Sequence, residues 1–404
     1  MRILYPLLWS RLGRQACRAQ SIATAAALAR RGHEVTLLMP RGADDPVLTP
    51  EKLRAWFAVE GELRLVQRPS RWAGERLHRS LMWLRQAFRD PETLGSDLLY
   101  SRIPAMLAMG GLSPLPFATD HYRLWPDELP AIRPLVRRAA RHRDCLGLIL
   151  HSEHAARAYR RAGVAEERIL VAHNGYDAPG ERPDKAAARI ALGLPPNRPI
   201  ALYAGRIDGA KGLDRLLELA DLRPHILFLL VGSEGDGAIE RDAARRANVR
   251  VVPWAEPARL PAWLAAADVL VVPPSRAPLE RHRSCVLPIK LFAYLAAGRP
   301  ILAPEAPDTA ELLRHGETGW LVAPDEPGAA AAGLDRLLGD AALSARIAGG
   351  ALRLSAGLGW DARADRIAAF LQARLAQRSL YTNTAMPVSA ATTGAAQAPT
   401  AAGR

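Results

Sequence analysis

Short apolar runs alternate with segments of helical periodicity along most of the chain. In the first half, the runs that read as buried strands are 3–8, 35–39, 63–66, 98–100, 116–119, 146–151 and 169–172. Helical patterns separate most of them, at 14–31, 72–89, 127–143 and 152–162. This alternation predicts β-α-β units, in which helices cover both faces of a parallel sheet.

The pattern pauses at the polar, Gly- and Pro-rich stretch 174–183 and then restarts. Further strands are predicted at 200–204, 226–231, 249–252, 269–272, 301–303 and 320–322, and helices at 212–222, 257–267, 288–297, 328–338, 341–358 and 360–376. The chain therefore divides into two α/β halves of similar size. The Ala/Thr/Pro-rich end, from about residue 380 to 404, has too little large apolar content to pack and is expected to be a disordered tail.

Composition agrees with a packed two-domain protein, since 49% of the 404 residues are apolar. The 3 cysteines form no C-x-x-C pair, which argues against a disulfide framework and favours a reduced, cytoplasmic compartment. We find no signal peptide and no apolar stretch long enough to cross a membrane.

The formal net charge of +13 is the unusual feature. Nucleic acid, an anionic membrane surface or a phosphorylated small molecule would each explain it. Nearly all the basic residues are Arg, scattered along the chain, so part of the excess is compositional. Nucleic-acid binding is disfavoured because there is no basic block, no known motif and no series of stacking aromatics.

In open parallel sheets, ligands bind beyond the carboxyl ends of the strands, so the loops after strands are the places to search. The loop Gly205–Gly212 carries Arg206 and Lys211 and opens a helix, an arrangement that suits a diphosphate. Lys290 lies at the start of another such helix. The alternative is ordinary turns with solvated charges. Lys is rare in this chain, which has Lys52, Lys185, Lys211 and Lys290. Two of these lysines, Lys211 and Lys290, lie at the two helix starts.

Other candidates are weaker. His121 follows a strand beside Asp120 and is either a proton-exchanging group or a structural histidine. Gly232 ends a strand without a G-x-G-x-x-G fingerprint, which disfavours a dinucleotide dehydrogenase. Glu234 and Asp236 have the spacing of a metal-nucleotide site but read better as a solvated loop, so no metal site is expected.

Several ordered motifs resemble the retaining glycosyltransferases of family 4, which have the GT-B fold. They are HSEHAARAYRRAGVAEERILVAHNGYD, LYAGRIDGAKGLDRLLE and YLAAGRPILAPEAPDTAELLRHGETGWLVAP. The resemblance covers about residues 2–376. It implies an acceptor-side Rossmann-like domain at 1–175, a nucleotide-sugar-binding Rossmann-like domain at 176–358 facing it across a cleft, a helix at 359–378 that crosses back, and the tail 379–404.

The resemblance also implies roles for individual residues. Arg206 and Lys211 would bind the donor diphosphate, and His121 would contact the donor sugar near the reacting centre. The remaining donor contacts would be Gly13, Asn174, Gly205, Gly232, Trp254 at the nucleobase, Ile289, Lys290 and Glu311. The implied reaction moves a sugar from a nucleotide diphosphate to an acceptor hydroxyl with retention, by a front-face route, with no metal and no other cofactor.

One departure concerns the donor. The family's two Glu separated by seven residues are replaced by Cys285 and Ala293. We expect an active enzyme with altered donor contacts; a non-catalytic binding protein and a nucleotide-sugar epimerase are the alternatives.

The expected acceptor is a glycan or a lipid-linked sugar of a bacterial surface polysaccharide or glycolipid. The basic, Trp-containing stretch 68–89 suggests contact with an anionic membrane, although a helix packed on its own sheet explains it equally well. No nucleic-acid partner is expected.

Overall fold

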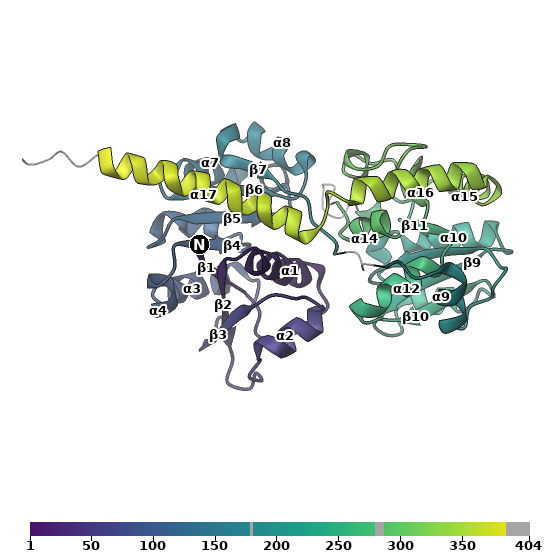
Figure 1. The fold of residues 1–404 in the computed structure, drawn as a ribbon, viewed down its shortest axis with the longest axis horizontal. Coiled ribbons are helices and arrows are strands. Elements are labelled where there is room, and N and C mark those ends of the chain that lie inside the picture. Colours follow the sequence, from purple (N-terminus) through teal and green to yellow (C-terminus); the bar gives the residue numbers. More distant parts are fainter. Residues whose placement is uncertain (178–180, 279–286, 385–404) are drawn as a thin grey trace, which may run out of the picture.

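The computed structural model describes residues 1–177, 181–278 and 287–384, which form two parallel sheets of seven and six strands in two lobes (Figure 1). The first sheet has the order β3-β2-β1-β4-β5-β6-β7 and the second the order β10-β9-β8-β11-β12-β13. Every predicted strand is present. The strands are β1 (Arg2–Pro6), β2 (Glu34–Arg41), β3 (Leu63–Pro69), β4 (Leu98–Ser101), β5 (Phe117–His121), β6 (Cys145–Leu150), β7 (Ile169–Val171), β8 (Ile200–Ala204), β9 (Leu227–Ser233), β10 (Val249–Pro253), β11 (Val269–Val271), β12 (Ile301–Pro304) and β13 (Trp320–Val322).

Helices pack on both faces of each sheet, as the alternating pattern predicts. Those of the first lobe are α1 (Ala16–Arg30), α2 (Pro50–Phe57), α3 (Leu77–Ala87), α4 (Pro91–Leu94), α5 (Met106–Met109), α6 (Trp125–Glu128), α7 (Arg133–Arg141) and α8 (Glu153–Arg161). Those that follow are α9 (Lys185–Ala191), α10 (Leu213–Leu222), α11 (Ala238–Ala243), α12 (Leu260–Ala266), α14 (Lys290–Ala296), α15 (Pro327–Gly339), α16 (Ala341–Ser355) and α17 (Trp360–Thr384).

Two predicted helices of the first lobe are wrong in extent. The helix expected from residue 72 begins only at Leu77, because Gly74 adopts a positive φ of 126° and its amide bonds back to the carbonyl of Leu8. The helix expected over 127–143 is split into α6 and α7. Pro130 lies between the two helices, and Pro134 lies in the first turn of α7. Helices α2, α9 and α11 have at most eight residues, too few for a clear periodicity, and were not predicted.

The basic stretch 68–89 contains α3, whose apolar side packs inside the first lobe. Trp83 is fully buried and Leu84 lies beside it in the same apolar cluster. Packing inside its own lobe therefore accounts for Trp83, while Trp72 is half-buried.

Helix α17 crosses from the second lobe back to the first and lies along α1 and β6 (Figure 1, yellow). Trp360, Ile367 and Leu371 are buried in the first lobe's apolar cluster. The helix continues to Thr384, so residues 379–384, which were expected to belong to the tail, are helical. Arg378 Nε donates to Asp144 Oδ1 at 2.8 Å, which fixes the helix near its end. The rest of the expected tail, 385–404, lies outside the described residues.

The two chain crossings between the lobes lie side by side. The Tyr176 amide donates to the carbonyl of Leu358 at 3.1 Å. The Trp360 amide donates to Asp177 Oδ1, also at 3.1 Å. A side chain at Gly175 would collide with the backbone of Trp360, so only glycine allows this approach.

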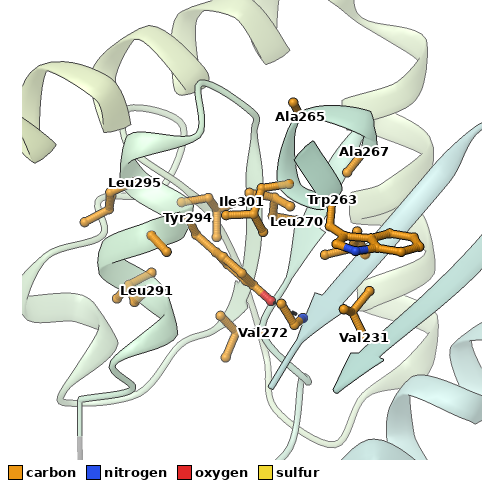
Figure 2. Close-up of a cluster of buried hydrophobic side chains, with 14 of the residues drawn as sticks. Val231, Trp263, Ala265, Ala267, Leu270, Val272, Leu291, Tyr294, Leu295 and Ile301 are labelled. Atoms are coloured by element: carbon orange, nitrogen blue, oxygen red, sulfur yellow. Dashed lines mark hydrogen bonds between the residues drawn. The ribbon is translucent and has the colours of Figure 1, made fainter. Parts of the chain in front are cut away.

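An apolar cluster covers one face of the second sheet, and in it α12 and α14 pack against the strands (Figure 2). Tyr294 is fully buried there, and its hydroxyl accepts a hydrogen bond from the amide of Ala204 at 2.7 Å. This contact anchors α14 to the end of β8, which places the start of α14 at the carboxyl edge of the sheet. In the described part of the chain, no helix combines the length and the apolar character that crossing a membrane requires.

Candidate functional site

The carboxyl ends of the two sheets face each other, and contacts between them join the lobes. Trp56 of α2 stacks on Trp254, which follows β10, with ring centroids 6.0 Å apart and planes inclined by 18°. Arg14, in the loop after β1, lies 4.3 Å from the centroid of the same Trp254 ring. Its guanidinium is also 4.0 Å from Glu234. Trp254, expected at the nucleobase, thus lies where the two lobes meet.

Two glycines open the carboxyl edge of the second sheet. The Gly205 amide donates to the carbonyl of Val231 at 2.9 Å, so the loops after β8 and β9 touch. Gly205 and Gly232 have positive φ angles of 145° and 127°. A Cβ on Gly232 would overlap the carbonyl of Gly205, and one on Gly205 would lie 2.7 Å from Lys290 Nζ. Both predicted positions therefore require glycine.

Lys290 is the most unusual cation of this edge. Its Nζ lies 3.5 Å from the centroid of the Tyr203 ring, a close cation–π contact. Burial, and next the charge of Lys211, hold the pKa of Lys290 well below its usual range. The two basic side chains therefore influence each other at this edge of the sheet. The structure thus brings together Gly205, Lys211 and Lys290, which were predicted from separate motifs.

Arg206 lies at the outer side of this group. The residue is exposed, and its carbonyl accepts a hydrogen bond from the Tyr203 hydroxyl at 2.8 Å. The same ring therefore holds the backbone of Arg206 and carries the ammonium of Lys290 on its face. The guanidinium of Arg206 remains accessible to a ligand.

His121 ends β5 and is 2% exposed. Burial lowers the pKa of His121 to about 4, so its imidazole is neutral at physiological pH. Its Nε2 is buried and has no hydrogen-bond partner among the described residues. Because buried polar atoms are normally paired, this nitrogen is a candidate for a ligand contact.

Asp120 does not assist His121 as its neighbour. Adjacent strand residues point to opposite faces, and Asp120 enters a buried network instead. Its Oδ1 lies 2.5 Å from His151 Nε2, and its Oδ2 accepts from the Tyr100 hydroxyl at 2.6 Å. Arg363 of α17 donates to Oδ2 at 2.8 Å. The sequence analysis missed this network, because Arg363 lies far away in the chain and in a helix with no motif.

Glu311, expected to bind the donor, is engaged by the first lobe. Its two oxygens accept from the amides of Glu153 and His154, at 2.6 and 3.1 Å, at the start of α8. His173 Nε2 lies 2.6 Å from Oε1. Burial raises the pKa of Glu311, but the hydrogen bonds from His173 and the two amides outweigh it, so the net shift is downward. In this arrangement Glu311 joins the lobes.

The other expected donor contacts lie around the meeting point of the lobes. Asn174 is 6% exposed, and its Oδ1 has no partner in the described part of the chain. Ile289 precedes α14 and packs against the apolar cluster of the first lobe. The carbonyl of Gly13 accepts from Trp56 Nε1 at 3.4 Å, which supports the tryptophan that stacks on Trp254.

The sequence was interpreted as having Cys285 and Ala293 where the family has two Glu, and no metal site was expected. Ala293 is 5% exposed and packs in the second lobe's core, while Cys285 lies outside the described residues. Within 1–177, 181–278 and 287–384, no three His, Cys, Asp or Glu side chains gather as a metal site would require.

Comparison with known families agrees with this architecture. Residues 198–340 match the model described as "Glycosyl transferases group 1", and residues 21–178 match "Glycosyltransferase Family 4". Each match falls on one of the two lobes. The chain belongs to the family 4 glycosyltransferases and has their two-domain GT-B fold.

Individual relatives differ in how much they share. The D-inositol 3-phosphate glycosyltransferase of Streptomyces avermitilis is 34% identical over 236 residues, which are 54% of this chain and 49% of the relative. The chain thus spans about half the length of the curated relatives it matches. The structure of HepE from Anabaena in complex with UDP-glucose aligns with a TM-score of 0.69 at 19% identity, covering 92% of this chain and 100% of that one. Sucrose-phosphate synthase from Thermosynechococcus elongatus gives 0.66 at 20% identity, covering 95% and 99%.

Proposed function

We propose that the protein is a glycosyltransferase that moves a sugar from a nucleotide diphosphate to an acceptor hydroxyl with retention of anomeric configuration. The observation that carries the proposal is the presence of Lys211 and Lys290 at the carboxyl edge of the second sheet, where Gly205 and Gly232 have no side chains. Lys290 is half-buried, its Nζ lies 3.5 Å from the centroid of the Tyr203 ring, and desolvation together with the charge of Lys211 lowers its pKa. A diphosphate placed there would meet both side chains.

The same cations account for the chemistry of the leaving group. Negative charge develops on the diphosphate as the glycosidic bond breaks, and fixed cations stabilise it most where water is excluded. Lys290 is fixed by its contact with the Tyr203 ring, and Arg206 is available at the mouth of the loop. We expect these residues to act without a metal, and EDTA treatment with activity measurement tests this.

His121 is proposed to contact the donor sugar through its unpartnered Nε2. A double displacement would need a carboxylate nucleophile near it. Asp120, its neighbour in sequence, is a poor candidate because both of its oxygens are taken by Tyr100, His151 and Arg363. This favours a single front-face displacement, in which the acceptor enters on the side from which the diphosphate leaves.

A non-catalytic donor-binding protein is the second candidate, and Ala293 is the observation that favours it. Where the family has a carboxylate for donor hydroxyls, this chain buries a methyl group in the core. We favour the enzyme because the cations and His121 are still present, and we expect the donor sugar to be held by other groups.

The acceptor is proposed to be a glycan or a lipid-linked sugar of a bacterial surface polymer, with the reaction on the cytoplasmic side of the membrane. A peripheral membrane contact would use the start of α3, where Leu77 is 66% exposed and Arg76 and Arg79 are also exposed. Co-sedimentation with anionic vesicles, compared between the native protein and Leu77→Ser, tests this contact.

A thermal-shift screen of UDP-, GDP- and ADP-sugars tests the donor site. One of these donors is expected to stabilise the native protein, and Arg206→Ala and Lys211→Ala are expected to reduce that shift. Lys52→Ala is the matched control, because Lys52 is exposed on α2 and lies outside the site. A native protein that no nucleotide sugar stabilises would contradict the proposed donor site.

Transfer itself needs a separate readout. Release of the nucleoside diphosphate that depends on acceptor, together with the anomeric configuration of the product by NMR, distinguishes the two candidates. Donor binding without turnover would favour the non-catalytic protein, and an inverted product would exclude retention.

A further inference from the structure

Arginine–aromatic pairs recur in the loops at the carboxyl edge of the first sheet. Each guanidinium lies over a ring, between 4.3 and 5.3 Å from its centroid. The pairs are Arg18 with Trp9, Arg71 with Trp72, Arg102 with Tyr122, and Arg123 with Trp125. We call these eight residues the arginine–aromatic rim. Its members follow β1, β4 and β5, which are neighbours in the sheet, and β3, the edge strand that β2 separates from β1.

The rim is one surface, because its loops touch. The amide of Gly74, two residues after Trp72, donates to the carbonyl of Leu8 at 2.7 Å, which joins the loops after β3 and β1. Arg102 Nη1 donates to the carbonyl of Cys17 at 2.8 Å, which joins the loop after β4 to α1. The pKa of Tyr122 is raised by burial and is influenced by Arg102 and Arg123 together.

The rim carries more positive than negative charge. Arg18 donates to the carbonyl of Arg11 at 2.7 Å, its Nε is buried without a partner among the described residues, and burial lowers its pKa. Arg102 lies 3.9 Å from Asp120, and its Nη1 donates to the carbonyl of Cys17 and to Gln20 Oε1. The opposing charges are Glu128, which pairs with Arg123, and Glu75, which influences Arg18 and Tyr122.

A depression extends the rim beside the loop after β3. It has a volume of about 300 Å³ and is lined by Arg41, Gly42, Ala43, Pro69, Ser70 and Arg71. Arg71 therefore belongs to both the rim and the depression. No ion pair of Arg41 or Arg71 is found in the part of the chain that the structure describes.

We infer that the acceptor is an anionic saccharide, a sugar that carries a phosphate or carboxylate, and that the rim binds its charged group. This inference rests on the proposed function and names the acceptor class. The guanidinium of Arg71 lies over the Trp72 ring, which leaves its N–H edge for the two oxygens of an anion, whereas Arg18, Arg102 and Arg123 also donate to protein groups. Tyr122, which is 37% exposed, and the half-buried Trp72 present ring surface on which a sugar face packs. A free sugar phosphate and a sugar on a polyprenyl diphosphate share this chemistry.

Matched acceptor pairs test the inference. Glucose is compared with glucose 6-phosphate and with glucuronate, and a polyprenyl diphosphate-linked N-acetylglucosamine in detergent is compared with free N-acetylglucosamine. Both binding, by isothermal titration, and transfer, by nucleoside diphosphate release, are measured. At least one anionic member is expected to bind 10-fold or more tighter than its neutral partner, with an affinity that falls as salt is raised. Preference for the free or the lipid-linked anion identifies the source.

Substitutions in the arginine–aromatic rim test whether a preference for anionic acceptors depends on the rim. Arg18→Gln and Arg71→Gln are expected to raise the KM for the anionic acceptor by 10- to 100-fold and to leave the thermal shift with nucleotide unchanged. Arg138→Gln is the control, because Arg138 is exposed like Arg71 and is in the same lobe, but it lies on α7, near the amino end of β6. Equal binding of neutral and anionic sugars, or rim variants that behave like the control, would overturn the inference.

The outcome is separable from that of the proposed function. If no nucleotide binds, the donor site is wrong, and the titrations with anionic saccharides still judge the rim. If a nucleotide binds and its shift is lost in Lys211→Ala, but no anionic acceptor is preferred, only the inference about the acceptor fails.

Discussion

The carboxyl edges of the two sheets have the same topology but opposite chemistry. At the edge of the second sheet, glycines remove side chains, and the charge of Lys211 acts on Lys290, whose ammonium lies over the Tyr203 ring. At the edge of the first sheet, arginines lie over aromatic rings, and below them a buried carboxylate, Asp120, is fully paired. One edge is suited to a small, highly charged group that approaches the backbone. The other offers wide, flat contacts.

This difference assigns separate work to the two lobes. Under the proposed function, fixed cations at the second edge would act on charge that develops during the reaction, so their loss should reduce turnover. The first edge would act on recognition and on the placement of His121, so changes there should appear in KM, in stability or in pH dependence. Four predictions examine this division, from the largest expected effect to the smallest.

Replacing Lys290 should have the largest effect. Lys290→Met removes the cation that is fixed over Tyr203 and is expected to reduce kcat by roughly 10²- to 10³-fold, as is typical when one group that stabilises developing charge is lost. The melting temperature should stay the same or rise, since a desolvated ammonium is removed. Lys52→Met is the control, and a Lys290→Met enzyme with native kcat would remove the second edge from catalysis.

Acid should weaken the first lobe before the second. The pKa values of His121 and His151 are both lowered to about 4 by burial, from an ordinary 6.5. Between these two values the unfolded chain binds protons that the folded lobe excludes, so the free energy of unfolding falls as the pH drops. The loss is up to about 3 kcal/mol for each histidine. In the described part of the second lobe, the histidines His225 and His315 are both exposed.

Hydrogen exchange measured at pH 7.5 and pH 5, and corrected for intrinsic rates, checks this difference. Peptides from β5 and β6 should lose protection in acid while those from β8 and β9 keep it. A uniform loss across both lobes would contradict the assignment of acid sensitivity to the two buried histidines.

Glu311 tests whether the two edges depend on each other. Glu311→Gln removes the charge that meets His173 and the amides at the start of α8. The free energy that holds the two lobes together through Glu311 should fall by about 2 kcal/mol, the scale of hydrogen bonds to a charged group. The radius of gyration from X-ray scattering should increase, and the KM for donor should rise. Glu305→Gln, at an exposed carboxylate in the same lobe, should change neither.

The stacked tryptophans should give the smallest effect. Trp56→Ala removes the contact with Trp254 and should cost about 1 kcal/mol, close to a fivefold rise in the KM for donor. Trp56→Phe, which keeps a ring at this position, should recover most of the loss. An equal effect of both substitutions would show that stacking between the lobes is not what matters.

The sequence was informative about everything that depends on local pattern. All strands of both sheets were predicted, because buried parallel strands are short continuous apolar runs between turn signals. The glycine and lysine positions of the second edge were also found, since a loop that precedes a helix has a recognisable composition. Gly205, Gly232, Lys211 and Lys290 are close together in the structure, as their motifs predicted.

Contacts between distant segments were not predictable. Asp120 looked like a partner of His121 because the two are adjacent, yet the alternation of a strand directs it to the opposite face and to Arg363. Glu311 carries a family motif, but its contacts with His173 and α8 depend on how the lobes meet. The rim escaped notice for the same reason, since its arginines and rings come from four loops and no single loop shows them together.

Helix α17 has a consequence for synthesis of the protein. Arg363 follows Asp120 by 243 residues, and the apolar seam of α17 completes the first lobe's core. While the ribosome makes the intervening chain, for on the order of ten seconds or more, Asp120 lacks its guanidinium and the face of α1 lacks its cover. The first lobe is therefore translated first but completed last. A nascent chain that stops before residue 360 should expose the face of α1 that α17 covers to chaperones, even with all of the first sheet's strands already made.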